Sequence, residues 1–243
     1  FYKPLCNHQH IFNNFYFNFF ELLFYIISNL LITLFMNNEK KIVLVDYKMG
    51  NYHSVSRSLH RIGINSIISS EPETILSADK VILVGVGHFK KAMENLYSLN
   101  LIDSLNQYVM NEKKPILGIC LGMQLMAEHG EEGDCSGLGW VNGKIKKFQV
   151  EDTLRFKIPH TGWNQINTVK KSALMQQIPD CSEFYFVHSY YFHTDKEDII
   201  LNTTNYSNNF ISAIEMDNIY GVQYHPEKSH DQGLQLLSNF VNM

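Results

Sequence analysis

One cysteine stands between two glycines in the segment Gly118-Ile119-Cys120-Leu121-Gly122. An apolar run at 116–119 precedes this cysteine, and residues 123–129 follow it with helix-like spacing. A nucleophile on a sharp strand-to-helix turn needs small neighbours, because the strained backbone leaves little room for side chains. The N–H groups at the start of a helix also stabilise a thiolate and, later, an oxyanion. The spacing therefore predicts that Cys120 is a nucleophile, with a buried structural cysteine as the alternative.

A histidine and a carboxylate follow far downstream, in the segment Gly221-Val222-Gln223-Tyr224-His225-Pro226-Glu227. In nucleophilic acyl chemistry, a histidine takes the thiol proton and returns it to the leaving group. A neighbouring acid holds the imidazole in the useful tautomer and stabilises its charged form. His-Pro-Glu by itself is a common turn. Together with Cys120, however, it predicts a Cys120–His225–Glu227 triad.

The elements that must position this triad alternate between strands and helices. Apolar runs predict strands at 41–46, 66–68, 81–84 and 116–119, and helical spacing predicts helices at 51–62, 89–96 and 99–110. This alternation is typical of an α/β doubly wound sheet, which binds ligands at the carboxyl ends of its strands. After Gly139 the pattern predicts strands at 141–148, 184–187, 199–203, 211–216 and 219–223, and a last helix at 232–240.

Composition limits the other functions. The 243 residues, 45% of them apolar, suffice for one large α/β domain or two small ones. A net charge of −4 gives no basic field for nucleic acid. The four cysteines form no C-x-x-C pair, and the sequence contains neither a clustered metal-ligand motif nor a Walker-type phosphate loop. We expect a cytoplasmic enzyme that uses no metal or other cofactor.

Residues 1–36 differ in composition from the rest of the chain. They are rich in aromatic side chains, and the first methionine is Met36. The apolar run at 19–36 approaches the length of a membrane span, but it contains Glu21 and has no flanking Lys or Arg cluster. We interpret 1–36 as an extension outside the native domain, arising from upstream translation, and we place the domain at 37–243. A membrane or partner segment and a helix packed on the domain are the alternatives.

These motifs resemble a known family. The segment from Gly118 to Gln124, together with His225-Pro226-Glu227, is similar to the class I (triad) glutamine amidotransferases, whose glutaminase domains hydrolyse glutamine and pass on ammonia. Other segments resemble the glutaminase subunits of imidazole glycerol phosphate synthases, of histidine biosynthesis: Asp46-Tyr47-Lys48-Met49-Gly50-Asn51, Gly85-Val86-Gly87, His160-Thr161-Gly162-Trp163-Asn164, Tyr185-Phe186-Val187-His188-Ser189-Tyr190 and His225-Pro226-Glu227-Lys228-Ser229. The resemblance runs from about residue 41 to the end. It implies a flavodoxin-like amidotransferase fold over 37–243, with a mostly parallel sheet, flanking helices and extra antiparallel strands in the C-terminal half.

The resemblance also implies a role for each matching residue. Cys120 would form a glutamyl thioester, His225 would act as general acid and base, and Glu227 would orient it. The remaining implied site residues are Val86, Gly87 and Leu121 in the oxyanion hole, Gly85, Gln124, His188, Ser189 and Tyr190 around glutamine, and Trp163, Asn164 and Lys228 at a partner interface.

The implied partner is a cyclase of (β/α)8 barrel form, which would use the ammonia to make imidazole glycerol phosphate and AICAR. The family works as a heterodimer, and the partner's bound substrate activates the glutaminase. The sequence departs from the family pattern at Val84, Lys48 and Thr161, where proline, glycine and methionine are usual. These departures leave open a paralogue that feeds a sugar-modifying synthase of surface polysaccharides. Further alternatives are a Cys-His-Glu hydrolase of another amide and a membrane-tethered binding protein.

Overall fold

The computed structural model describes residues 21–27, which form a short helix, and residues 40–243. Most of the interpreted extension at 1–36 lies outside these residues. The segment Lys40–Met243 folds as one unit. Within the described residues, no helix is long and apolar enough to cross a bilayer.

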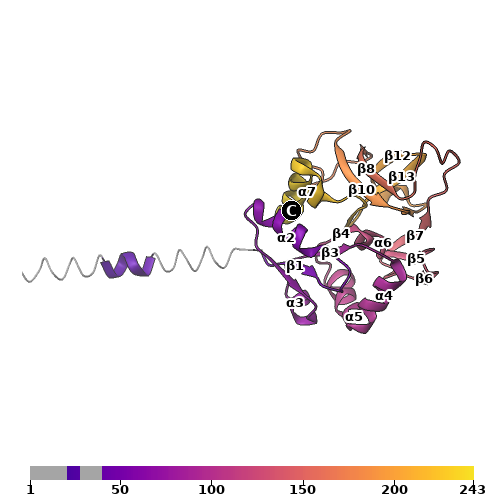
Figure 1. Ribbon diagram of the computed structural model, residues 1–243. Coiled ribbons are helices and arrows are strands. Elements are labelled where there is room, and N and C mark those ends of the chain that lie inside the picture. Colours follow the sequence, from indigo (N-terminus) through magenta and orange to yellow (C-terminus); the bar gives the residue numbers. More distant parts are fainter. Residues whose placement is uncertain (1–20, 28–39) are drawn as a thin grey trace, which may run out of the picture. The chain divides into compact units, whose positions relative to one another are not determined.

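Five neighbouring strands run parallel in the order β2-β1-β3-β4-β14 (Figure 1). Their bounds are Ser66–Ser69 (β2), Ile42–Val45 (β1), Lys80–Gly85 (β3), Ile116–Cys120 (β4) and Ile219–Val222 (β14). Every residue of β1, β3 and β4 is buried, because helices cover both faces of a parallel sheet. The four strands predicted before residue 120 are confirmed.

Alternate residues of these strands face two separate cores. Ile42 and Leu44 pack in one core with helices α2 (Tyr52–Arg61) and α7 (His230–Asn242). Val43 and Val45 pack in the other, with α3 (Pro72–Leu76), α4 (Phe89–Ser98) and α5 (Leu101–Asn106). Figure 1 shows these two helix layers on opposite sides of the sheet. This two-sided covering confirms the predicted doubly wound α/β class.

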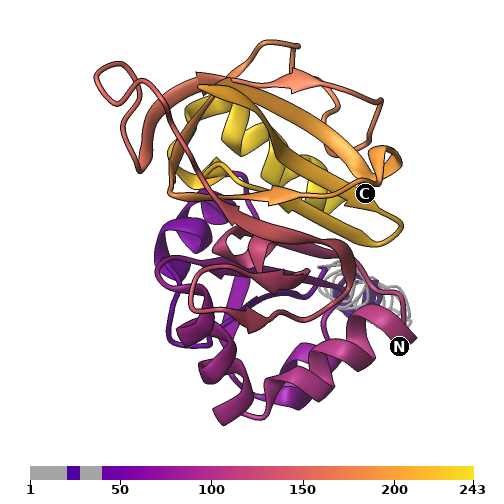
Figure 2. The same cartoon turned by 90° about the vertical axis from the view of Figure 1, so that its right-hand side faces the viewer.

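Beyond β14 the sheet continues through β13, β11, β7, β5 and β6, while β12 pairs with β13 and β9 (Figure 2). Most of these pairs are antiparallel, as expected for the C-terminal half. A separate antiparallel pair joins β8 to β10. The bounds are Ala127–Gly130 (β5), Cys135–Ser136 (β6), Val141–Lys147 (β7), His160–Gln165 (β8), Asn167–Thr168 (β9), Glu183–His188 (β10), Tyr190–His193 (β11), Ile200–Tyr206 (β12) and Asn208–Met216 (β13).

The helix predicted at 123–129 is wrong. Helix α6 is a single turn, Leu121–Gln124, and the chain then passes into β5. The carbonyls that would continue the helix accept other partners: Leu138 N–H donates to Leu125, and Trp140 N–H donates to Met126. Hydrogen bonds to the segment before β7 therefore replace the bonds that a continued helix would make, although the local spacing favours a helix.

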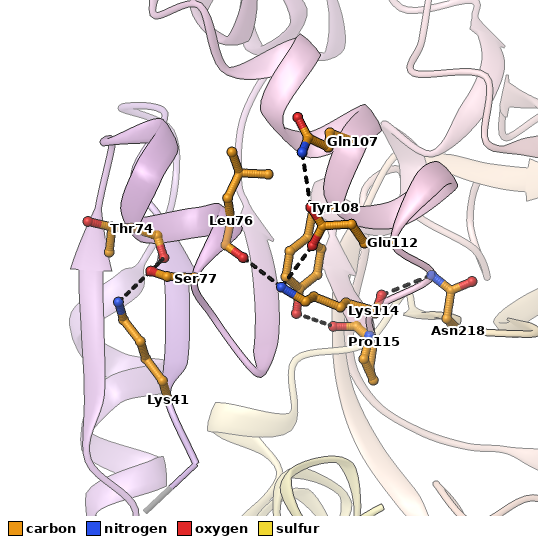
Figure 3. A network of polar contacts seen from close by, with 10 residues as sticks. All are labelled: Lys41, Thr74, Leu76, Ser77, Gln107, Tyr108, Glu112, Lys114, Pro115 and Asn218. Atoms are coloured by element: carbon orange, nitrogen blue, oxygen red, sulfur yellow. Dashed lines mark hydrogen bonds and ion pairs between the residues drawn. The ribbon is translucent and has the colours of Figure 1, made fainter.

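A network of hydrogen bonds and ion pairs connects the amino ends of the parallel strands (Figure 3). The Lys114 ammonium, just before β4, contacts the Leu76 carbonyl at 2.7 Å and the Glu112 carboxylate at 2.8 Å. Asn218, just before β14, donates its side-chain amide to the Lys114 carbonyl at 2.9 Å. These bonds fix the entry of β4 and β14 into the sheet, and the opposite ends of the same two strands carry the predicted triad.

Candidate active site

Cys120 ends β4 with φ +54° and ψ −112°, a backbone conformation that is strained for any residue with a side chain. The next residue, Leu121, already begins helix α6. A Cβ added to Gly122 would overlap the Leu83 carbonyl, and one added to Gly118 would lie 2.6 Å from the Met123 nitrogen. The flanking glycines thus supply the room that the sequence predicted for this turn.

The sheet brings His225 and Glu227 to this turn. Strand β14 lies parallel to β4, with Val222 in register with Ile119, so the segment after β14 emerges beside Cys120. His225 Nδ1 is 2.8 Å from Glu227 Oε1, and both side chains are fully buried. Because a carboxylate only accepts, Nδ1 carries the proton and Nε2 is left for proton transfer. Among the described residues, Nε2 is one of four buried side-chain atoms without a hydrogen-bond partner.

Charges around His225 favour its protonated form. Burial of the imidazole opposes the charge, but the neighbouring Cys120 thiolate, followed by Glu227, outweighs this opposition and raises the pKa of His225 to about 10. An imidazolium beside a sulfur is the arrangement that activates a cysteine nucleophile. The geometry supports the three predicted catalytic roles.

The sulfur lies at a cavity of about 260 Å³. Its lining includes members of the predicted triad, of the predicted oxyanion hole and of the predicted glutamine pocket. They are Val86, Gly87, Cys120, Leu121, Gln124, His188, Ser189, Tyr190 and His225. Gly85 instead pairs with Cys120 inside the sheet and lies outside this lining.

The predicted oxyanion-hole donors differ in whether their backbone N–H groups are free to bind an oxyanion. Leu121 is the first residue of α6, where a backbone N–H has no acceptor within the helix. The Val86 N–H donates to the Met49 carbonyl at 2.8 Å. In this structure Leu121 can therefore offer its N–H to the cavity, whereas the Val86 N–H is already bonded. Val84, the departure noted in the sequence, is buried in β3 opposite Ile119.

A chain of hydrogen bonds runs through two buried histidines behind the cavity. His188 Nδ1 is 2.7 Å from the Tyr190 carbonyl, and its Nε2 is 3.0 Å from His160 Nδ1. The Asn164 amide lies 3.2 Å from His160 Nε2. A carbonyl only accepts, so each ring donates from Nδ1 and accepts at Nε2, and both rings are neutral. Burial lowers the pKa of His160 to about 4 and that of His188 to about 3.

Two of the predicted interface residues lie on an exposed aromatic cluster. The Trp163 side chain is 44% exposed and stacks on His230, with ring centroids 4.9 Å apart. Tyr185 packs edge-on against Trp163, and the Lys228 ammonium lies 5.4 Å from the Tyr185 ring centroid. Asn164, the third predicted interface residue, is half-buried and directs its amide to His160 and to the Asn205 carbonyl.

Two polar site residues were missed by sequence reasoning. Glu132 lines the cavity, and its Oε2 accepts the Phe89 N–H at 2.7 Å. Gln223 is fully buried and directs its amide nitrogen to the Cys120 sulfur at 3.6 Å. Glu132 belongs to no short motif, but Gln223 stands two residues before the predicted base, a position that could have drawn attention to it.

Comparison with known proteins agrees with this geometry. The family model for glutamine amidotransferase class-I matches residues 43–243. Imidazole glycerol phosphate synthase subunit HisH 2 of Methanococcus maripaludis is 49% identical over 82% of this chain and 98% of that protein. Subunit HisH 1 of Campylobacter jejuni is 45% identical over 83% of this chain and all of that protein.

Solved structures share the fold at low identity. The structure of a putative GMP synthase protein from Thermoplasma acidophilum superposes with a TM-score of 0.64 at 19% identity, over 84% of this chain and 94% of that one. PurLQS of Thermotoga maritima gives a TM-score of 0.62 at 14% identity, over 84% and 98% of the two chains. The family model over residues 43–243 and the relatives at 49% and 45% identity show that the chain belongs to the class-I glutamine amidotransferase family.

Proposed function

We propose that this chain is the glutaminase subunit of an imidazole glycerol phosphate synthase. It hydrolyses L-glutamine to glutamate and ammonia in the cytoplasm and supplies the ammonia to a cyclase subunit, which makes imidazole glycerol phosphate and AICAR for histidine biosynthesis. The observation that carries the proposal is the buried His225–Glu227 pair beside the strained Cys120 turn, in a chain that is 49% identical to a HisH subunit.

Acylation begins at Cys120. Its thiolate attacks the side-chain carbonyl carbon of glutamine, and the Leu121 N–H stabilises the negative oxygen that forms. His225 then gives its Nε2 proton to the departing nitrogen as the C–N bond breaks, which releases ammonia and leaves a glutamyl thioester. Glu227 holds the proton on Nδ1, so that Nε2 is always the atom that exchanges a proton with the reactants.

Deacylation uses the same groups in reverse. His225, now neutral, takes a proton from water at Nε2, and the resulting hydroxide attacks the thioester carbonyl. The C–S bond breaks, glutamate leaves and the thiolate is restored beside the imidazolium. Each cycle consumes one glutamine and one water and yields one glutamate and one ammonia.

Glutamine is recognised by one carboxylate in the cavity and by a wall of uncharged side chains beside it. The Glu132 carboxylate lines the cavity, and because Oε2 accepts the Phe89 N–H, Oε1 is left for the α-ammonium of the substrate. His188, Ser189 and Tyr190 form the wall at which the resemblance places the substrate. We assign these residues and Gln124 to glutamine binding.

The partner docks on the exposed aromatic cluster around Trp163, with Lys228 and Asn164 beside it. Large aromatic side chains with a cation at their edge are typical of protein interfaces. Lys228 directly follows Glu227 in sequence, so the docked surface adjoins the triad. We propose a cyclase of (β/α)8 barrel form as this partner and a closed passage for ammonia between the two subunits.

Glutamate release from glutamine tests the proposal. The full chain is assayed alone, with the histidine-pathway cyclase of the same organism, and with that cyclase plus its ribulosyl-linked nucleotide substrate. We expect a large rise that needs the cyclase and its substrate and is lost in Cys120→Ala. The Cys120→Ala complex should still make product from added ammonium salt. No rise with a correctly assembled complex would refute the histidine-pathway role and favour a paralogue that feeds a sugar-modifying synthase.

A further inference from the structure

Gln223 approaches the nucleophile from the interior of the protein. Its side chain is fully buried, and its backbone N–H is bonded to the Ser212 carbonyl at 2.8 Å. The amide nitrogen lies 3.6 Å from the Cys120 sulfur, within range of an N–H···S hydrogen bond. Gln223 is absent from the cavity lining. It therefore contacts the reacting atom without contacting the space that glutamine would occupy.

The orientation of this amide is fixed by a second amide. The Gln124 nitrogen is 3.1 Å from the Tyr190 carbonyl and 2.9 Å from Gln223 Oε1. Because the Tyr190 carbonyl only accepts, Gln124 must present its NH2 group there and, with its second hydrogen, to Gln223. Gln223 accepts that hydrogen through Oε1, so its own NH2 group faces the sulfur.

We propose that Gln223 is a catalytic residue that stabilises the Cys120 thiolate through its amide N–H. A hydrogen bond to a charged acceptor is stronger than one to a neutral acceptor, so the bond favours the thiolate over the thiol. It weakens when the sulfur becomes part of the neutral thioester and returns when the C–S bond breaks. The proposal rests on the proposed function only for the identity of the acyl group on the sulfur.

The test measures the reactivity of Cys120 without any turnover of glutamine. The full chain is treated with iodoacetamide across a range of pH, and mass spectrometry follows alkylation of the peptide that contains Cys120, apart from the other cysteines. In Gln223→Met, which keeps an unbranched side chain but has no N–H, we expect the midpoint of the rate profile to move up by about one pH unit. Gln223→Glu, which turns a carboxylate oxygen toward the sulfur, should move it further in the same direction.

Gln235→Met is the matched control, since the Gln235 amide bonds to Asn239 on helix α7 instead of to the site. It should leave the alkylation profile of Cys120 unchanged. An unchanged profile in a folded Gln223→Met protein would overturn the proposal.

A measurement on the unsubstituted protein covers the case in which the Gln223 variants do not fold. In an NMR titration, the side-chain amide proton of Gln223 should shift with the same midpoint as the alkylation rate, and this shift should vanish in Cys120→Ala. If the chemical shift of this amide proton does not change as Cys120 ionises, the proposed role of Gln223 is refuted. A protein that shows the shift but does not hydrolyse glutamine even when assembled with the cyclase and its substrate would instead refute the proposed function.

Discussion

The buried pair of His160 and His188 should make the protein lose stability as the pH falls below about 6.5. Burial lowers the pKa of His160 from 6.5 to about 4 and that of His188 from 6.5 to about 3. In the unfolded chain both rings take up a proton near pH 6.5, whereas the folded chain resists this uptake. The stability that the neutral pair contributes is therefore complete above pH 6.5 and is lost as the pH falls toward the folded pKa values.

The expected loss is large relative to the stability of a domain. At a pH of about 4.5, linkage gives a loss of about 2.5 kcal/mol for each ring and roughly 5 kcal/mol for the pair. Other shifted groups act outside this interval. His225, with its raised pKa, keeps its proton in the folded chain over this whole range, so its stabilisation is nearly complete at pH 6.5 and is lost only at higher pH, and the carboxylates with lowered pKa, such as Asp46 and Asp180, act mainly at still lower pH.

Urea unfolding at several pH values between about 7 and 4.5 measures this loss. His160→Phe keeps a ring stacked between Phe186 and Tyr206 and removes one titrating group, so the acid-induced loss should fall to about half. His53→Phe makes the same change at an exposed position of α2 and should retain the full loss. An unfolding free energy that stays constant to within about 1 kcal/mol over this range, or an equal loss in His160→Phe, would refute the reasoning.

Four further predictions concern the catalytic site. Cys120→Ser removes the group that contributes most to raising the pKa of His225. NMR titration of the His225 ring in this variant should therefore give a pKa below about 10. Glu227→Gln should lower the glutaminase kcat by roughly 10⁴-fold, less than His225→Ala, because an orienting group contributes less than the group that moves the proton; steady-state assays of both variants with the cyclase complex check this order. Gly122→Ala forces a Cβ against the Leu83 carbonyl, so thermal unfolding should show a destabilisation of about 1–3 kcal/mol, and Cys120 alkylation should slow. Glu132→Gln still accepts the Phe89 N–H but loses its charge, so the KM for glutamine should rise by about tenfold while kcat changes little, and an unchanged KM would contradict the assigned ammonium contact.

The parallel half of the fold and the positions of Cys120, His225 and Glu227 at strand ends could be predicted because their patterns are local. Each buried strand is one apolar run, so the strands at 81–84 and 116–119 lie inside the observed Lys80–Gly85 and Ile116–Cys120. The cysteine turn and His225-Pro226-Glu227 are likewise short motifs at the ends of such strands. The adjacency of β4 and β14 follows from the fold class and brings the two motifs together.

The other features of the fold and of the site depend on pairing between segments that are far apart in the sequence. Short sequence patterns carry no information about such pairing. Strand β8 has mostly polar residues and forms only against β10, which sets His160 directly opposite His188. Helix 123–129 was predicted from spacing, but the carbonyls of Leu125 and Met126 bond to a segment further along the chain. The catalytic, glutamine-binding, oxyanion and interface assignments stay predictions until the complex is assayed.

The position of β14 also determines the stage of chain synthesis at which the active site can form. Cys120 and Gln223 are separated by 103 positions in sequence, and β14 inserts between β4 and β13 in the sheet. Such non-local pairing forms late, because the long intervening loop must close first. A ribosome-bound or prematurely terminated chain that ends before β14 carries the nucleophile but neither its base nor its buried amide. Incomplete chains therefore cannot hydrolyse glutamine, and ammonia release begins only with molecules whose synthesis has passed the last strand of the sheet.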